Sequence, residues 1–366
     1  MQKIWQAETS WRKWSITTIA VSFSVVLGAA LLAFVVDPHY RYRAPFFYDM
    51  VYYEIYATAP HILKNQKYDL LMLGTSMTRN FFINDIDSAF DCRSVKLSAA
   101  GGTMQDLCKF FEVAQQSRKE KLKRVIWSLD IYTLNKTGSY YADFDYLYRE
   151  DHKEDYRYLF SRRTFSSMFY LLKRKLRPKR NRFHQVDRNR MFSTDYDGKP
   201  YGLRQIIASA FYNERFHHTQ TPFNLQNHQK NFYDRLLPVF DNNPQIHFTV
   251  FLPPYHIYTY CLSEYFGESD ALILQRSSVM KELLKRKNVT LHDFQADGSY
   301  VEDSDHFSDV QHFNNAAARK VLDDLVSGRR RIVTPEDVDA NEKELRKLIK
   351  KNMPRYRKHI EELKGV

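Results

Sequence analysis

One uncharged run in the sequence is long enough to cross a lipid bilayer. Ser15 to Val36 reads SITTIAVSFSVVLGAALLAFVV and contains no charged side chain. With a rise of about 1.5 Å per residue it forms a helix of about 33 Å, and the hydrocarbon core of a bilayer is about 30 Å thick. A buried core helix and a cleaved signal peptide are the alternatives, although the apolar part of a signal peptide usually has only about 7–15 residues. The run therefore predicts a transmembrane signal-anchor at 15–36.

The charges beside this run predict its orientation. Lys3, Arg12 and Lys13 precede it, whereas Arg41 and Arg43 follow it. With the free amino group, the positive charge is slightly greater on the N-terminal side, and the positive-inside rule places that side in the cytoplasm. We therefore expect a single-pass protein of the cell membrane. Its segments are a cytoplasmic N-terminus (1–14), a membrane-proximal linker (37–67) and an extracytoplasmic remainder.

The composition indicates a sizeable folded region beyond the membrane segment. The chain has 366 residues, of which 43% are hydrophobic, enough for one large domain or two small ones. Its formal net charge of +12 favours anionic surroundings. No fold pattern supports nucleic-acid binding, so no nucleic acid is expected as a partner. Cys92, Cys108 and Cys261 have no metal-ligand spacing, and one disulfide with a spare thiol remains open.

From Tyr68 onward, short apolar runs alternate with helical patterns. YDLLMLG is a short apolar run that ends in glycine, as expected for a buried parallel strand. Further strands are predicted in SVKLSAAGG, RVIWSLDIYTL, QIHFTVFLPPY and VTLHDF, with helices in TMQDLCKFFEVAQQSRKE and ALILQRSSVMKELLKRK. This order predicts an α/β domain at 68–330 with a doubly wound, mostly parallel sheet in a flavodoxin-like, three-layer arrangement.

Two parts of the chain do not follow this alternation. Residues from about 136 to 230 predict a helical insertion or lid, and residues 331–366 predict a charged helical tail. Within the insertion, the run KRKLRPKRNR (173–182) is strongly basic. It is either a solvated loop or a contact for an anionic ligand or lipid headgroup.

A candidate serine nucleophile and candidate histidine bases occur at opposite ends of the predicted domain. Ser76 directly follows the first predicted strand, in LMLGTSMTRN, where it could also simply cap a helix. Near the other end, Asp303-x-x-His306 and Asp309-x-x-His312 follow each other closely. A serine hydroxyl needs a base, and an Asp beside a His can fix the tautomer that accepts its proton. The same acidic and imidazole groups could instead ligate a metal ion.

LMLGTSMTRN and DVQHFNNAAARKVL together resemble the SGNH/GDSL hydrolase superfamily. In that superfamily the serine follows the first strand and a D-x-x-H precedes the last helix. The single N-terminal span is most similar to the membrane-anchored branch. That branch includes DltD, the D-alanine transfer protein of teichoic acids, and the AlgJ/AlgX-type polysaccharide O-acetyltransferases. The resemblance covers about 68–130 and 245–325 and none of the insertion.

The resemblance implies a role for each matching residue. Ser76 would be the nucleophile, His312 its general base and Asp309 the residue that orients the base. The backbone N–H groups of Ser76 and Gly101 would stabilise the oxyanion. The alternative pair is Asp303 and His306. The small-residue helix that begins after His312 favours the later pair.

One block of the superfamily is missing here. Its third block supplies an asparagine side chain to the oxyanion, whereas this chain has WSLDIYTLN, with Asp130 in that region. An inward-pointing carboxylate would repel an oxyanion. His256, after the Pro-Pro sequence in LPPYHIY, is expected to be structural.

The expected function is that of a membrane-anchored serine acyltransferase or esterase. It would act through an acyl-enzyme on an anionic cell-surface polymer, transferring an acetyl or a D-alanyl group, without a cofactor or metal. A multi-span membrane acyltransferase is implied as its partner. The alternatives are a non-catalytic scaffold or polymer-binding protein of a membrane acylation complex, and a metal site formed by His306, His312 and nearby Asp residues.

Overall fold

The computed structural model describes residues 2–176, 186–193, 200–215 and 224–364. Its internal contacts divide the chain into two compact units. We call residues 1–50 with 144–182 the N-terminal unit, and residues 51–143 with 183–366 the sheet unit.

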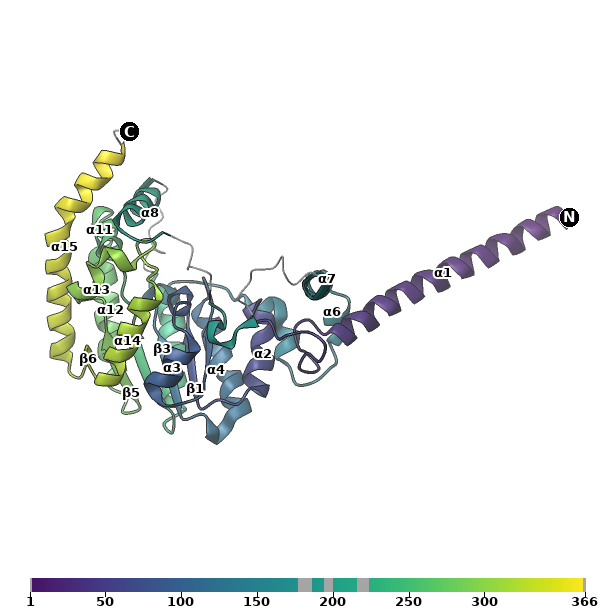
Figure 1. Cartoon of the computed structure of the whole chain (residues 1–366), viewed down its shortest axis with the longest axis horizontal. Helices are drawn as coiled ribbons and strands as arrows, with labels where there is room; N and C mark the ends of the chain where they lie inside the picture. The colour runs from purple at the N-terminus through teal and green to yellow at the C-terminus, as the bar shows by residue number, and fades with distance from the viewer. Residues whose placement is uncertain (1, 177–185, 194–199, 216–223, 365–366) are drawn as a thin grey trace. The chain divides into compact units, whose positions relative to one another are not determined.

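The N-terminal unit begins with α1 (Gln2–Val36), of which Trp11–Val36 is long and apolar enough to cross a membrane (Figure 1). Most side chains of this stretch are exposed, as contact with lipid requires. Near its end, Ala30, Ala33 and Val36 are buried, and Ala33 and Val36 pack with Met168. The other helices of this unit are α5 (Asp145–Tyr148), α6 (Asp155–Leu159) and α7 (Arg162–Leu176).

The sheet unit is built on six strands in the order β2-β1-β3-β4-β5-β6. The first five are parallel, and β6 pairs antiparallel with β5. The strands are β1 (Leu70–Gly74), β2 (Ser94–Ser98), β3 (Arg124–Ser128), β4 (His247–Leu252), β5 (Val289–Asp293) and β6 (Arg331–Ile332). The predicted mixed α/β class with a mostly parallel sheet is therefore confirmed.

Helices and short helical turns surround the sheet. Among them, α4 packs on α2 and on the π-helix η9, α3 packs on α14, and α15 packs on α11 and α12. Their bounds are α2 (Ile55–Asn65), η1 (Ser76–Thr78), α3 (Ile83–Phe90), α4 (Met104–Arg118), η2 (Lys119–Lys121), η3 (Ile131–Leu134), η4 (Tyr141–Phe144), η7 (Arg188–Arg190), α8 (Leu203–Arg215), α9 (Leu225–His228), η9 (Gln229–Leu236), α10 (Leu237–Asp241), α11 (Ile257–Tyr265), α12 (Ser269–Leu283), α13 (Gly298–Val301), η10 (Ser304–His306), α14 (Asn315–Ser327) and α15 (Pro335–Lys364).

The units differ from the expected domain boundaries for reasons of packing. The expected linker 37–67 is divided, because α2 buries an apolar face against α4. The expected insertion 136–230 is also divided, because residues 144–182 belong to the N-terminal unit. The tail helix α15 buries side chains such as Leu345 and Tyr356 within the sheet unit.

The strand order places several chain turns at one edge of the sheet. β1 lies between β2 and β3, so the chain leaves β1 in one direction and later returns to its other side. Because these strands are parallel, the turns that begin after Gly74, Ser98 and Ser128 share the carboxyl edge. Ligand sites of open α/β sheets commonly lie where the strand order reverses in this way.

Candidate active site

Ser76 lies in a tight turn immediately after the buried strand β1. The strand ends at Gly74, where an added Cβ would overlap with the Thr78 side chain and lie 2.9 Å from Ser128 Cβ. Thr75 then caps the short helix η1 by accepting a hydrogen bond from Met77 N. Ser76 is the first residue of η1 and remains partly exposed. The turn therefore presents the hydroxyl at the carboxyl edge of the sheet.

His312 belongs to a short hairpin-like loop that precedes α14. Phe307 and Phe313 form an isolated antiparallel bridge, flanked by a hydrogen bond of 2.9 Å from Ser308 N to His312 O. At the tip of the loop, Asp309 Oδ1 accepts hydrogen bonds of 2.8 Å from the N–H groups of Gln311 and His312. The carboxylate therefore fixes the backbone that carries the imidazole.

The structure brings Ser76, His312 and Asp309 into one chain of hydrogen bonds. His312 Nε2 lies 2.8 Å from Ser76 Oγ, and His312 Nδ1 lies 2.8 Å from Asp309 Oδ2. The side chains of His312 and Asp309 are 22% and 31% exposed, so the group is open to a substrate.

The surroundings of Asp309 determine which nitrogen of His312 carries a proton beside it. Burial alone would raise the pKa of this carboxyl, but His312 and the N–H groups of the turn hold the pKa below its ordinary value. An ionised carboxylate only accepts hydrogen bonds, so Nδ1 of His312 carries the proton. With the proton on Nδ1, the tautomer that leaves Nε2 free to accept from the Ser76 hydroxyl is the one a general base requires.

Two asparagines connect the serine turn to the histidine loop, and sequence reasoning did not identify this connection. The buried Asn80 donates a hydrogen bond to Phe313 O, and Asn315 donates one of 2.8 Å to Asn80 O. Asn314 caps α14, accepting from Ala317 N at 3.0 Å. The adjacent asparagines therefore have different roles.

Lys96 of β2 holds the segment that follows η1, and sequence reasoning did not identify this role either. Its side chain is fully buried, and its Nζ donates hydrogen bonds to Arg79 O at 3.0 Å, Phe81 O at 2.7 Å and Ser193 Oγ at 2.9 Å. Burial, with the charge of Arg79, lowers the pKa of this ammonium group. Three acceptors fit the three N–H bonds of a lysine.

The predicted oxyanion donors lie in neighbouring turns. Ala99 N donates to Gly74 O at 2.8 Å, which holds the turn after β2 beside the turn after β1. Gly101 has a positive φ of 67° in that turn, a conformation that favours glycine. Within the described ranges, the N–H groups of Ser76 and Gly101 have no hydrogen-bond acceptor, so both remain available to a ligand.

Asp130 is held by three hydrogen-bond donors. Its carboxylate accepts from Thr75 Oγ1 at 3.1 Å, Tyr255 Oη at 2.7 Å and Tyr132 N at 3.2 Å. It thereby connects the turn after β3 to the residue that precedes Ser76.

The alternative pair is formed but is not hydrogen-bonded to Ser76. His306 Nδ1 lies 2.8 Å from Asp303 Oδ2, and these side chains are 36% and 37% exposed.

His256 is buried, and its Nδ1 accepts from Tyr258 N at 3.2 Å. Its Nε2–H therefore donates to Ser304 Oγ at 3.2 Å, so His256 is not a base for that serine. Burial, followed by the charge of Arg355, lowers the pKa of His256 to about 3.

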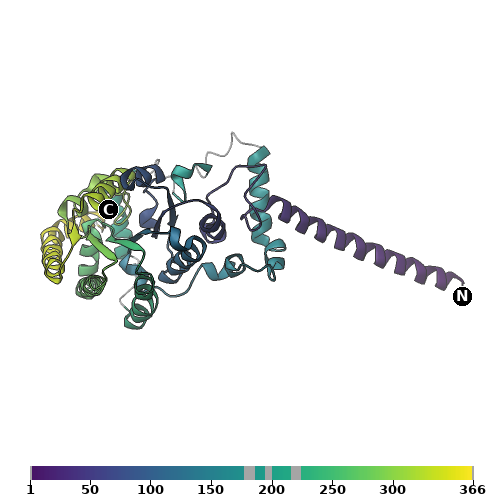
Figure 2. The same cartoon turned by 90° about the horizontal axis from the view of Figure 1, so that it is seen from below.

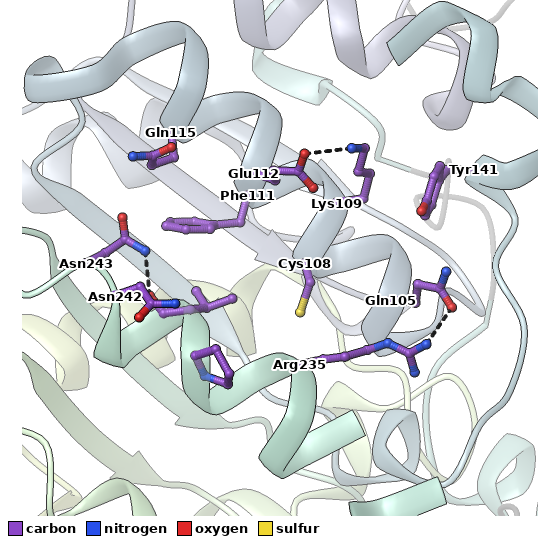
Figure 3. A pocket seen from close by; sticks show the side chains of 12 residues that line it. Gln105, Cys108, Lys109, Phe111, Glu112, Gln115, Tyr141, Arg235, Asn242 and Asn243 are labelled. Carbon is purple, nitrogen blue, oxygen red and sulfur yellow. Dashed lines mark hydrogen bonds and ion pairs between the residues drawn. The ribbon is translucent and has the colours of Figure 1, made fainter. Parts of the chain in front are cut away.

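A groove of about 520 Å³ lies between α4 and the segment η9–α10 (Figure 3). Arg235 of η9 points into it and bonds only amide oxygens in the described chain, Asn231 Oδ1 at 2.7 Å and Gln105 Oε1 at 3.1 Å. Asn231 Nδ2 also donates to Lys136 O at 2.8 Å, and Lys136 Nζ donates to Gly101 O at 3.3 Å. One network therefore joins the groove to the Gly101 turn.

Metal ligation and disulfide formation find no counterpart in the residues the structure describes. No group of three or more His, Cys, Asp or Glu side chains is arranged there to hold a metal ion. Cys92, Cys108 and Cys261 are free thiols.

Comparisons of the chain with known protein families, with curated proteins and with solved structures find no match.

Proposed function

We propose that the protein is a serine acyltransferase or esterase of the SGNH type, anchored in the membrane by α1. The observation that carries this proposal is the hydrogen-bonded chain Ser76–His312–Asp309 at the carboxyl edge of the sheet. The strand order β2-β1-β3-β4-β5 supports it, because flavodoxin-like doubly wound folds have this order and bind ligands where it reverses.

In the first half-reaction, His312 Nε2 takes the Ser76 proton as Oγ attacks the carbonyl carbon of the acyl donor. The imidazolium that forms is stabilised by the carboxylate of Asp309. The carbonyl oxygen becomes an anion, for which the unpaired N–H groups of Ser76 and Gly101 are the proposed donors. His312 then returns the proton to the leaving group, and an acyl ester on Ser76 remains.

In the second half-reaction, an acceptor hydroxyl gives its proton to His312 and attacks the ester carbonyl. The acyl group moves to the acceptor oxygen, and the proton returns to Ser76 Oγ. With water as the acceptor, the same steps hydrolyse the ester.

We place an anionic polymer acceptor in the groove beside α4. Lys136 and Arg235 hydrogen-bond only carbonyl and amide oxygens in the described chain, so no carboxylate neutralises them there. Arg235 is held by Gln105 in the first turn of α4, only four residues after Gly101. A phosphate or carboxylate of the polymer can pair with these cations. The proposed site is extracytoplasmic, with a multi-span membrane protein supplying the acyl group.

The chemistry can be tested with a fluorophosphonate probe, which reacts with activated serines. The wild-type chain is expected to be labelled, and Ser76→Ala and His312→Ala are expected to lose labelling. His306→Ala is the matched control, because it removes an equally braced imidazole that does not contact Ser76. In cells, Ser76→Ala should abolish base-labile acylation of the surface polymer while the protein level is unchanged.

A non-catalytic scaffold is the competing function, and the presence of Asp130 in place of an oxyanion-binding asparagine favours it. A scaffold would leave surface acylation unchanged in Ser76→Ala. It would also give no labelling of the wild-type chain, or labelling that is independent of His312.

A further inference from the structure

The helix α7 lies across the end of the apolar part of α1. Met168 on α7 packs with Ala33 and Val36 of the last turns of α1. The two views show α7 running across α1 rather than along it (Figures 1 and 2). If α1 crosses the bilayer, Val36 lies at the membrane–water boundary, and a helix that crosses α1 there runs along the membrane surface.

The exposed surface of α7 combines apolar and basic side chains. Its buried side includes Ser167, Met168 and Leu171, whereas Phe169 and Leu176 are 62% and 81% exposed. These two residues are seven apart, so they lie on the same side of the helix. The sequence of α7 contains five basic residues and no acidic residue: Arg162, Arg163, Lys173, Arg174 and Lys175. Exposed aromatic and aliphatic groups beside Lys and Arg are typical of helices that lie in the bilayer interface.

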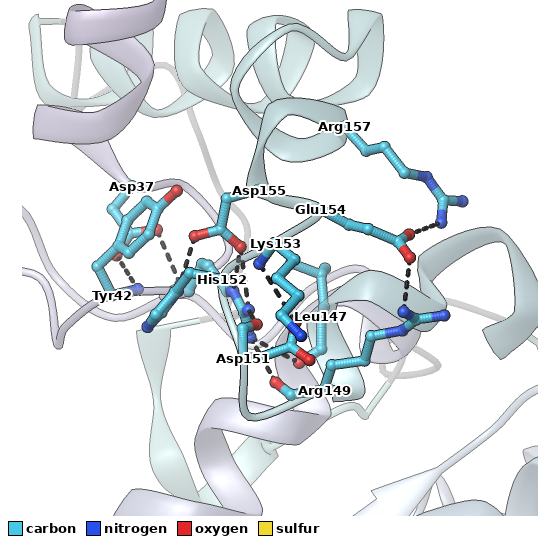
Figure 4. Close-up of polar contacts among 11 residues, drawn as sticks. Asp37, Tyr42, Leu147, Arg149, Asp151, His152, Lys153, Glu154, Asp155 and Arg157 are labelled. Carbon is cyan, nitrogen blue, oxygen red and sulfur yellow. Dashed lines mark hydrogen bonds and ion pairs between the residues drawn. The ribbon is translucent and has the colours of Figure 1, made fainter.

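Polar contacts hold the end of α1 within the N-terminal unit. Asp37 accepts hydrogen bonds from the N–H groups of Arg41, Tyr42 and Arg43 at 2.8 to 3.0 Å, and from Tyr158 Oη at 2.8 Å. Figure 4 shows Asp155 near Asp37 and His152, and the Arg41 side chain forms an ion pair of 3.0 Å with this Asp155. The residue that follows α1 is therefore tied directly to the helix that precedes α7.

A second set of contacts covers the carbonyl groups at the end of α1. Arg43 donates to Phe34 O at 2.6 Å and Val35 O at 3.2 Å, and Tyr48 donates to Val36 O at 2.8 Å. The Arg43 guanidinium lies 4.7 Å from the centre of the Phe34 ring and 5.8 Å from that of Phe46. Aromatic rings beside arginine at the end of an apolar helix are typical of the membrane–water boundary.

We propose that α7 is an interfacial helix that binds an anionic lipid surface. Phe169 and Leu176 insert among the acyl chains beside α1, and the basic residues contact lipid phosphates. The predicted basic run 173–182 begins on α7, and its part after Leu176 lies outside the described residues. The proposal depends on α1 crossing the membrane and is independent of the reaction at Ser76.

The test uses the full chain in vesicles of phosphatidylcholine and phosphatidylglycerol. An environment-sensitive fluorophore is attached to a single cysteine, in Phe169→Cys or in Leu176→Cys, after the three native cysteines have been replaced. The control is Lys347→Cys on α15, where the native side chain is 76% exposed. Quenching is measured with nitroxide-labelled lipids and with aqueous iodide.

Labels on α7 are expected to be quenched several-fold more by nitroxide lipids than the control label, and less by iodide. Quenching by iodide as strong as that of the control would overturn the proposal. Shielding from both quenchers would also overturn it, because it would show that protein covers α7. With phosphatidylcholine alone, or in Arg162→Glu/Lys173→Glu, lipid quenching should fall. Unchanged quenching in both cases would refute the role of anionic headgroups.

Discussion

At the scale of single residues, the pairs Asp303–His306 and Asp309–His312 have the same local geometry. In both, an Asp lies three residues before the His, and Oδ2 is 2.8 Å from Nδ1. Of these two imidazoles, only that of His312 has a serine hydroxyl at its other nitrogen. Substitutions in the two pairs can therefore be compared, to distinguish the effect of a carboxylate beside the imidazole from the effect of contact between the imidazole and Ser76.

Asp309→Asn should slow probe labelling of Ser76 by about 10²–10⁴-fold, because an amide cannot hold the required tautomer or stabilise the imidazolium. Asp303→Asn removes the equivalent carboxylate from the other pair and should change the labelling rate less than about 2-fold. Labelling rates of purified variants are measured against time. Equal effects of the two substitutions would contradict the role assigned to Asp309.

His256 should contribute to acid destabilisation. Its pKa is about 3 in the folded chain, against an ordinary value of 6.5. Between these values the unfolded chain binds a proton that the folded chain does not, so acidification lowers the free energy of unfolding. The contribution is about 1.4 kcal/mol for each pH unit below 6.5. His256→Asn removes it while keeping a side chain that can cap α11.

The measurement is the free energy of unfolding from denaturant titrations of wild type and His256→Asn at several pH values between 7 and 4. The free energy of unfolding of the wild type, minus that of His256→Asn, should become smaller as the pH falls through this range. If the two free energies instead had the same pH dependence, His256 would take up its proton in the folded chain over the same pH range as in the unfolded chain, which would contradict the prediction.

At the scale of elements, the sequence predicted those strands and helices that a local pattern of apolar residues determines. The five parallel strands occur where apolar runs end in glycine, proline or polar residues, and the helix after Gly102 occurs at the predicted position. The two-residue strand β6 has no such pattern and was missed. Lys96 was missed as well, since its burial depends on three acceptors that distant parts of the chain supply.

The candidate site could be predicted only in part from the sequence. Ser76 and the two D-x-x-H pairs were identifiable from strand position and spacing. The contact of one pair with Ser76 depends on the link between Asn80 and Asn315, which are distant in sequence. Likewise, the division of the predicted insertion depends on Met168 packing against Ala33 and Val36, which no local pattern encodes.

Gly74→Ala should disturb the turn that presents Ser76. The new Cβ would overlap with the Thr78 side chain, and Ser128 Cβ would be 2.9 Å away, so β1 or η1 must move. Such overpacking costs about 1–3 kcal/mol. We expect this loss in the free energy of unfolding, with a reduced rate of probe labelling. Gly28→Ala in α1, where nothing lies within 4 Å, is the control and should reduce neither quantity, because alanine is the better helix former.

Arg235→Gln and Lys136→Gln should weaken binding of an anionic acceptor in the groove beside α4. Both substitutions remove a charge while keeping a hydrogen-bond donor, so KM for the acceptor should rise, and more so in the double variant. Labelling of Ser76 by the uncharged probe should be unchanged in Arg235→Gln, since this side chain bonds Asn231 and Gln105 and contacts neither Ser76 nor Gly101. The salt dependence of acceptor binding should become weaker as the charges are removed. An unchanged KM would exclude the groove as the acceptor site.

At the scale of the whole molecule, the two units carry separate functions in our proposals. The N-terminal unit holds the apolar helix and the proposed interfacial helix, and the sheet unit holds the complete Ser76–His312–Asp309 group. No residue of this group comes from the N-terminal unit. Loss of membrane contact at α7 should therefore leave probe labelling of Ser76 intact, even where it impairs acylation of a surface polymer.

The orientation of the chain decides whether such a polymer can be its acceptor. Lys3, Arg12 and Lys13 lie before the apolar run, and Arg41 and Arg43 lie after it. The basic residues of α7 come more than a hundred residues later, and charges so far from a span have little influence on its orientation. The sheet unit is therefore predicted to be extracytoplasmic.

This prediction is tested in intact cells with a membrane-impermeant maleimide. With the native cysteines replaced, Lys347→Cys should be labelled without permeabilisation, because Lys347 is an exposed residue of the sheet unit. Lys3→Cys should be labelled only after permeabilisation, because it precedes the span. The reverse pattern would place Ser76 in the cytoplasm. A surface polymer would then be excluded as acceptor, whereas probe labelling of Ser76 and lipid contact of α7 would be unaffected, because neither depends on which side of the membrane the sheet unit occupies.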